Sequence, residues 1–131
     1  GDLHVRIQIN IRDHTDASAS SLSLAMRHMG YVEEALARLE SARDYLKECL
    51  LISQQYRKKD KESREYYYYV SLKDYAHILY VLEGYQEAYE DFKEVEEYLK
   101  SGKITYVHEY TLNFESIKEM QDCEEKCNGI Y

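Results

Sequence analysis

Two periodicities divide the chain. Residues 3–11 alternate between apolar and polar positions, which predicts a half-buried β-strand or an extended arm. A single strand leaves its backbone N–H and C=O groups without ladder partners. We therefore expect this segment to mediate a contact, for example with a second copy of the chain in a homodimer through residues 3–11; an arm without fixed structure is the alternative. Its apolar positions are Leu3, Val5, Ile7, Ile9 and Ile11.

From residue 16 onward the apolar residues recur every three or four positions, which predicts amphipathic helices. The expected helices run from Thr15 or Asp16 to Met29, from about Tyr31 to Tyr56, from about Lys61 to Leu82, from Tyr85 to about Lys100, and from about Ile104 to Cys127. The fold class is therefore all-α, with about five helices and an N-terminal strand or extended arm. We expect an arm at residues 1–14 and one helical domain at 15–131. Its hairpins would lie at about 16–57 and 61–101, joined by a charged connection, and its C-terminal helix at about 104–127.

A short motif occurs twice and suggests how these helices pair. Residues 30–36 read Gly-Tyr-Val-Glu-Glu-Ala-Leu, and residues 84–89 read Gly-Tyr-Gln-Glu-Ala-Tyr. In each copy an apolar run precedes the Gly and an amphipathic run follows it. A small residue that turns the chain, followed by one that permits close packing, predicts a helical hairpin, and two such hairpins favour a binding protein over an enzyme.

These hairpins resemble the tetratricopeptide repeat family, in which antiparallel helix pairs repeat about every 34 residues. The first hairpin matches the family at Leu22, Gly30, Tyr31, Ala35, Leu39 and Ala42, and the second at Tyr75, Ala76, Leu79, Gly84, Tyr85, Ala88, Phe92 and Val95. Ala35 and Ala88 are 53 positions apart and no Pro closes either repeat, so the repeats are degenerate.

The resemblance implies a scaffold, an adaptor or the helical sensing part of a signalling protein. Such a protein binds a peptide or helix in a concave groove lined by the first helix of each pair. The partner would be a protein or peptide. Carried onto this chain, the partner-binding positions are Arg27, His28, Lys73, His77 and Tyr80. An ordinary surface role is the alternative for each of them.

The composition of the chain excludes further classes of binding partner. The net charge of −8 disfavours nucleic acid, whose binding normally requires a basic surface. No apolar run is long enough to span a membrane, so no membrane contact is expected. The 15 Tyr residues leave two other functions open: a helical bundle that binds a small molecule in a Tyr-lined pocket, and a dimerisation module.

The chain also lacks the patterns of common catalytic and metal sites. No HExxH, Gly-rich phosphate loop or Gly-x-Ser-x-Gly occurs, and the five His are scattered. Cys49 lies in an apolar run and is expected to be a buried thiol, and Cys123 and Cys127 are expected to be reduced residues on one helix face. We therefore expect no enzyme activity, no cofactor and no metal. No cysteine requires an oxidising compartment, so a cytoplasmic location is expected.

Overall fold

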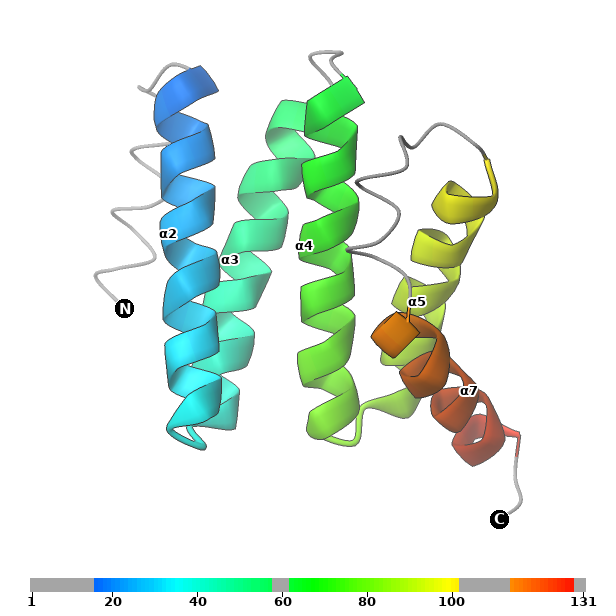
Figure 1. Ribbon diagram of the computed structural model, residues 1–131. Coiled ribbons are helices and arrows are strands. Elements are labelled where there is room, and N and C mark those ends of the chain that lie inside the picture. The colour runs from blue at the N-terminus through cyan, green and yellow to red at the C-terminus, as the bar shows by residue number, and fades with distance from the viewer. Residues whose placement is uncertain (1–15, 58–61, 102–113, 129–131) are drawn as a thin grey trace.

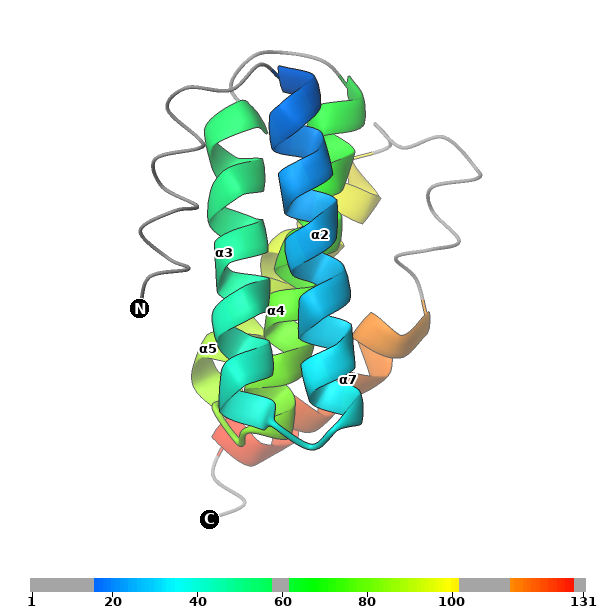
Figure 2. The ribbon, with the colours of Figure 1, turned by 90° about the vertical axis from the view of Figure 1, so that its left-hand side faces the viewer.

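The computed structural model describes residues 16–57, 62–101 and 114–128, and every regular element within these ranges is an α-helix. The helices are α2 (Asp16–Ala35), α3 (Leu39–Arg57), α4 (Glu62–Val81), α5 (Tyr85–Lys100) and α7 (Phe114–Cys127). Helices α2, α4 and α7 form one layer, with α3 and α5 behind it (Figures 1 and 2). Each helix packs against the next one in sequence, and α7 also contacts α4. The predicted all-α class is confirmed for these residues, and the strand predicted at 3–11 lies outside them.

The turn from α2 to α3 is closed by two backbone hydrogen bonds. The N–H of Ala37 donates to the carbonyl of Glu34, and the N–H of Arg38 donates to that of Glu33. This pair of bonds ends a helix through one residue in the left-handed region. That residue is Ala37, with φ of 60°, so the turn forms without glycine.

The turn from α4 to α5 has the same geometry. The N–H groups of Glu83 and Gly84 donate to the carbonyls of Tyr80 and Leu79, respectively. The left-handed residue is Glu83, with φ of 67°, and it lies 46 positions after Ala37. Helix α5 begins at Tyr85, as the sequence predicted.

The helix end predicted at Gly30 is wrong, because α2 continues through Gly30 to Ala35. Glycine inside a helix costs about 1 kcal/mol relative to alanine. Here, however, a Cβ at residue 30 would lie only 2.7 Å from Cγ and Cδ2 of Leu46 on α3. Gly30 therefore marks a close approach of two helices, and the second helix begins at Leu39 instead of Tyr31.

Residues of the first hairpin correspond to residues of the second hairpin 46 positions later in the sequence. Ala42 and Ala88 are both fully buried near the start of the second helix, and Leu46 and Phe92 follow one turn later. The predicted equivalence of Ala35 with Ala88, 53 positions apart, is therefore wrong, since Ala35 is exposed at the end of α2.

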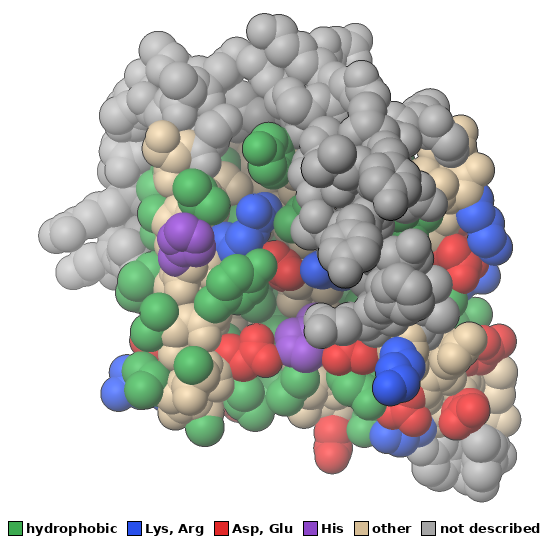
Figure 3. Space-filling view, in the orientation of Figure 1, with side chains coloured by type: hydrophobic (Ala, Val, Ile, Leu, Met, Phe, Trp, Pro, Cys, Tyr) green, Lys and Arg blue, Asp and Glu red, His purple; other side chains and the backbone are tan. Residues whose placement is uncertain are grey.

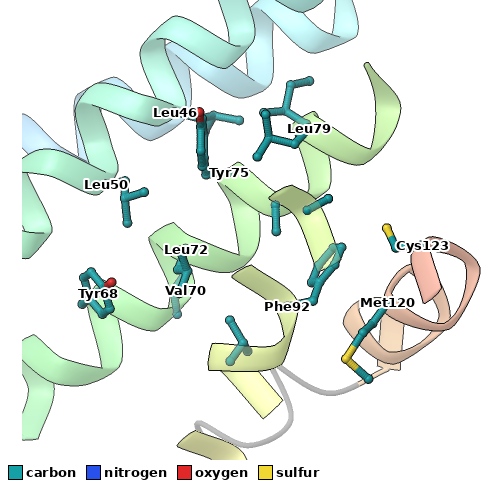
Figure 4. Packing of buried hydrophobic residues seen from close by; sticks show 14 of the residues in the cluster. Leu46, Leu50, Tyr68, Val70, Leu72, Tyr75, Leu79, Phe92, Met120 and Cys123 are labelled. Atoms are coloured by element: carbon teal, nitrogen blue, oxygen red, sulfur yellow. The ribbon is translucent and has the colours of Figure 1, made fainter. Parts of the chain in front are cut away.

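The main hydrophobic core lies between α3, α4 and α5, and α7 closes one end of it (Figure 4). Met120 and Cys123 of α7 face Phe92 of α5 in this cluster (Figure 4). Tyrosine contributes to the core at Tyr68, which is 7% exposed, whereas its neighbour Tyr67 is 51% exposed. The tyrosine-rich first half of α4 therefore contributes side chains to both the core and the surface.

Candidate functional site

Polar side chains of α2, α4 and α7 meet on the face of the molecule turned toward the viewer in Figure 3. Four of the five residues predicted to bind a partner lie here: Arg27 on α2 and Lys73, His77 and Tyr80 on α4. The fifth, His28, is exposed on α2. Acidic, basic and histidine side chains alternate across this face (Figure 3). We call it the polar face and define it by Arg27, Tyr31, Glu34, Lys73, Asp74, His77, Tyr80, Glu119, Asp122 and Lys126.

At one end of the polar face, Asp74 of α4 binds two side chains of α2. Nε of Arg27 lies 3.3 Å from Oδ2 of Asp74, and the hydroxyl of Tyr31 donates to the same oxygen at 2.6 Å. The Arg27 and Asp74 side chains are 12% and 9% exposed. Burial raises the pKa of Asp74, while the Tyr31 hydrogen bond and the nearby cations act in the opposite direction. The pKa of Tyr31 is also raised, first by burial and then by the Asp74 charge.

Lys73 adds a second cation to this carboxylate. Its Nζ lies 3.9 Å from Oδ1 of Asp74, and its side chain is 20% exposed. The two basic residues predicted to contact a partner, Arg27 and Lys73, therefore both interact with one acidic residue of the same chain. A partner that uses either cation has to compete with Asp74.

Beneath this ion pair lies a buried cluster of hydroxyl and thiol groups. Ser71 of α4 lies 3.0 Å from the Ser53 hydroxyl and 3.4 Å from the Cys49 sulfur, and both of these residues belong to α3. Ser23 of α2 lies 3.2 Å from Ser53, and Nη2 of Arg27 donates to Ser71 at 3.1 Å. These contacts join three helices and confirm Cys49 as a buried thiol, which is 1% exposed.

His77 joins α4 to both of its neighbours in the front layer. Its Nδ1 lies 2.8 Å from both carboxylate oxygens of Glu119 on α7, and its Nε2 lies 2.8 Å from Oε2 of Glu34 on α2. The hydrogen bond to Glu119, followed by that to Glu34, raises the pKa of His77 to about 9 against the opposing effect of burial. His77 is therefore protonated at neutral pH, and both ring nitrogens donate.

Tyr80, one turn further along α4, makes the second link to α7. Its hydroxyl donates to Oδ2 of Asp122 at 2.7 Å, and this bond raises the pKa of Tyr80 to about 12. Nζ of Lys126 lies 2.9 Å from the same oxygen and 4.7 Å from the centre of the Tyr85 ring. The Lys126 ammonium is thus held by a carboxylate and an aromatic face.

The sequence placed Lys73, His77 and Tyr80 on one helix but did not identify what they bind. The partners of His77 (Glu34 and Glu119) and of Tyr80 (Asp122) are each more than 40 positions distant in the sequence. Spacing along one helix carries no information on such pairs. The signal that was present is the three-residue spacing of Ser71, Asp74 and His77, which is typical of one helix face.

The chemistry of the polar face is that of hydrogen bonds and ion pairs. Among the described residues, no group of three or more His, Cys, Asp or Glu side chains is placed to hold a metal ion. Cys49, Cys123 and Cys127 are free thiols, and burial raises the pKa of Cys123 to about 11, which disfavours the reactive thiolate.

No family model, curated protein sequence or solved structure matches this chain. None of the helices that the structure describes is long and apolar enough to cross a membrane.

Proposed function

We propose that the protein is an interaction module that binds a peptide or helix of another protein along the polar face. The observation that supports this most strongly is the convergence of donors and acceptors from three helices that are distant in sequence. Several of these groups remain reachable from solvent, since Tyr31 is 44% exposed and the His77 side chain is 35% exposed. The proposal includes no catalytic step and no cofactor.

The helical hairpins support a tetratricopeptide-like assignment as part of the same proposal. Each hairpin has a small buried residue in its first helix, Gly30 or Ala76, and another 12 positions later in its second helix, Ala42 or Ala88. Small residues at these points let paired helices approach closely. In such stacked pairs the first helices line one surface, which here is the layer of α2, α4 and α7.

The charges of the polar face favour a partner with mixed polar groups over a strongly basic or acidic one. Asp74 is already neutralised by Arg27 and Lys73, and His77 by Glu34 and Glu119. A partner gains by inserting its own donors and acceptors at the partly exposed ends of these networks. The rings of Tyr31 and Tyr80 supply contact area at low entropic cost.

The proposal is tested by selecting peptides from a displayed library against the immobilised full chain. The binding variant carries Tyr31→Ala and Lys73→Ala on the polar face. A matched control carries Tyr89→Ala and Lys93→Ala, which remove the same side-chain types from α5 in the other layer. Both variants are checked for unchanged helicity by circular dichroism.

The proposal predicts that selected peptides bind the parent and the control equally and bind the polar-face variant at least about tenfold more weakly, a loss of about 1.4 kcal/mol. Failure to select any peptide, or equal binding to both variants, would contradict it. Loss of binding only in the α5 variant would assign the function to the other layer.

A further inference from the structure

The exposed side chains of α2 are mostly apolar from residue 21 onward, and the polar ones among them are Ser21, His28 and Tyr31. Between residues 21 and 36 none of the exposed side chains belongs to Asp, Glu, Lys or Arg. No other described helix covers this side of α2, which faces the viewer in Figure 2. The large apolar side chains on it are Leu24 (47% exposed), Met29 (39%), Val32 (51%) and Leu36 (54%).

The helix at the opposite end of the described fold has a different surface. Among the α7 side chains whose exposure the structure describes, from residue 118 onward, the exposed ones are Lys118, Gln121, Glu124 and Glu125, which are all polar or charged. Such a surface is expected of a helix that ends a stack and faces water. The two end helices of the described fold therefore differ: the exposed side chains are mostly apolar on α2 and polar on the described part of α7.

The shared register of the two hairpins identifies what this half of α2 is suited to contact. A shift of 46 positions places Ala25, Met29 and Val32 on Ser71, Tyr75 and Ile78 of α4. All three α4 residues are buried. Ser71 contacts Ser53 and Cys49 of α3, and the Tyr75 ring lies 4.8 Å from Nζ of Lys47 on α3. On α4, this arc of the helix therefore packs against another helix.

We propose that the exposed half of α2 forms a homodimer by packing against α2 of a second copy about a twofold axis. A twofold interface requires a patch that complements itself, and a mostly apolar surface with no exposed Asp, Glu, Lys or Arg meets its own copy without repulsion between such charges. A head-to-tail contact between α2 of one copy and α7 of the next is disfavoured because the exposed side chains described on α7, from residue 118 onward, are polar. This surface adjoins the polar face at Tyr31, but Leu24, Met29 and Val32 do not belong to that face, so the inference does not depend on the proposed function.

The size of the surface fits a dimer of moderate affinity. A helix of 20 residues is about 30 Å long, and contact along that length buries roughly 500 Å² on each copy, or about 1,000 Å² in total. That total lies at the lower limit for a specific protein interface. Dimers should therefore form in a micromolar concentration range.

The test measures the molar mass of the full chain by analytical ultracentrifugation from about 1 µM to about 1 mM, the range expected for an interface of this area. Val32→Glu places a carboxylate at the centre of the proposed contact. Leu51→Glu is the matched control, because Leu51 is an exposed aliphatic residue on α3 (38% exposed). Both variants should keep the parent's helicity, since both side chains are solvent-exposed in the single chain.

The parent and Leu51→Glu should dimerise alike, and Val32→Glu should raise the dimer dissociation constant at least about 100-fold because two carboxylates would face each other in an apolar contact. In a Cys127→Ser background, Met29→Cys should form a disulfide-linked dimer under mild oxidation, whereas Leu51→Cys should not. A monomeric parent throughout the range would overturn the proposal. A dimer that survives Val32→Glu but is lost in Val5→Lys, Ile7→Lys would also overturn it and assign the contact to residues 3–11.

Discussion

Gly30 of α2 lies so close to Leu46 of α3 that a Cβ on Gly30 would approach Cγ and Cδ2 of Leu46 to 2.7 Å. Leu46 is 1% exposed and has little room to move. We expect Gly30→Ala to lower the free energy of unfolding by about 1–2 kcal/mol. Overpacking costs about 1–3 kcal/mol and exceeds the roughly 1 kcal/mol gained in helix propensity. Urea unfolding measures the difference.

Gly84 provides the comparison for this effect. A Cβ added at Gly84 would lie 3.4 Å from its nearest neighbour, the Leu79 carbonyl oxygen. The Gly84 φ of −81° suits any residue. Gly84→Ala should therefore change the free energy of unfolding by less than about 1 kcal/mol. If both alanine variants were equally stable, Gly30 would not be the close contact between α2 and α3.

The ion pairs of His77 predict a pH-dependent stability. Its pKa rises from 6.5 in the unfolded chain to about 9 in the fold. The stabilising effect is thus fully present below pH 6.5 and is lost as the pH rises through about 9. We expect His77→Gln to lower the free energy of unfolding by about 1–2 kcal/mol at pH 6, a value reduced for solvent screening at a side chain that is 35% exposed.

The measurement is urea unfolding of parent and His77→Gln at several pH values between 6 and 10. Taking the difference between the two proteins cancels the titration of the groups they share. The stability gap should close toward pH 10. A gap that stays constant over this range would show that the Glu34 and Glu119 contacts do not hold the His77 proton.

The buried pair of Arg27 and Asp74 predicts a strong coupling. Asp74→Asn leaves the largely buried Arg27 without its carboxylate partner and should cost about 3 kcal/mol of stability. Arg27→Met combined with Asp74→Asn should cost less than the sum of the two single changes, because the largely buried Arg27 cation is removed together with its carboxylate partner. A double-mutant cycle measured by denaturant unfolding tests this, and strictly additive effects would refute the coupling.

Asp91 on α5 should be a destabilising residue at neutral pH. Burial, followed by the charges of Glu87 and Glu94, raises its pKa from 3.8 to about 6. Because the folded state binds the proton more tightly, the Asp91 contribution becomes more favourable as the pH falls from about 6 toward 3.8. Asp91→Asn should therefore raise the free energy of unfolding at pH 7 by about 1–2 kcal/mol, a value reduced for partial exposure.

The control for Asp91 is Glu97→Gln, which removes an exposed carboxylate from the same helix. It should change the stability at pH 7 by less than about 0.5 kcal/mol. If both variants gained the same amount, the effect would reflect the overall negative charge of the protein and not the partly buried position of Asp91.

The second hairpin was easier to predict from the sequence than the first. The α4–α5 turn includes Gly84 and precedes the clear apolar stripe of α5, so the bounds of α5 were predicted correctly. The α2–α3 turn has Ala37 in the left-handed position, and alanine gives no turn signal. Gly30 gave a misleading signal, because its role is close packing inside a helix.

The candidate site, too, could be predicted from the sequence only in part. The helical period grouped Lys73, His77 and Tyr80 on α4, since that grouping depends only on local geometry. The pairing of His77 and Tyr80 with side chains of α2 and α7 depends on how three helices pack, which a single sequence does not specify. Three of the residues predicted to bind a partner, Arg27, His77 and Tyr80, join the helices to one another.

The most direct test of the proposed binding face is a nuclear magnetic resonance titration of the isotope-labelled full chain with a peptide selected as above. If a peptide binds along the polar face, we expect the amide shift changes to concentrate in α2, α4 and α7 and to include Tyr31, His77 and Tyr80. The changes should be absent in the Tyr31→Ala, Lys73→Ala variant. Shift changes concentrated in α3 and α5, with α4 unaffected, would contradict peptide binding along the polar face.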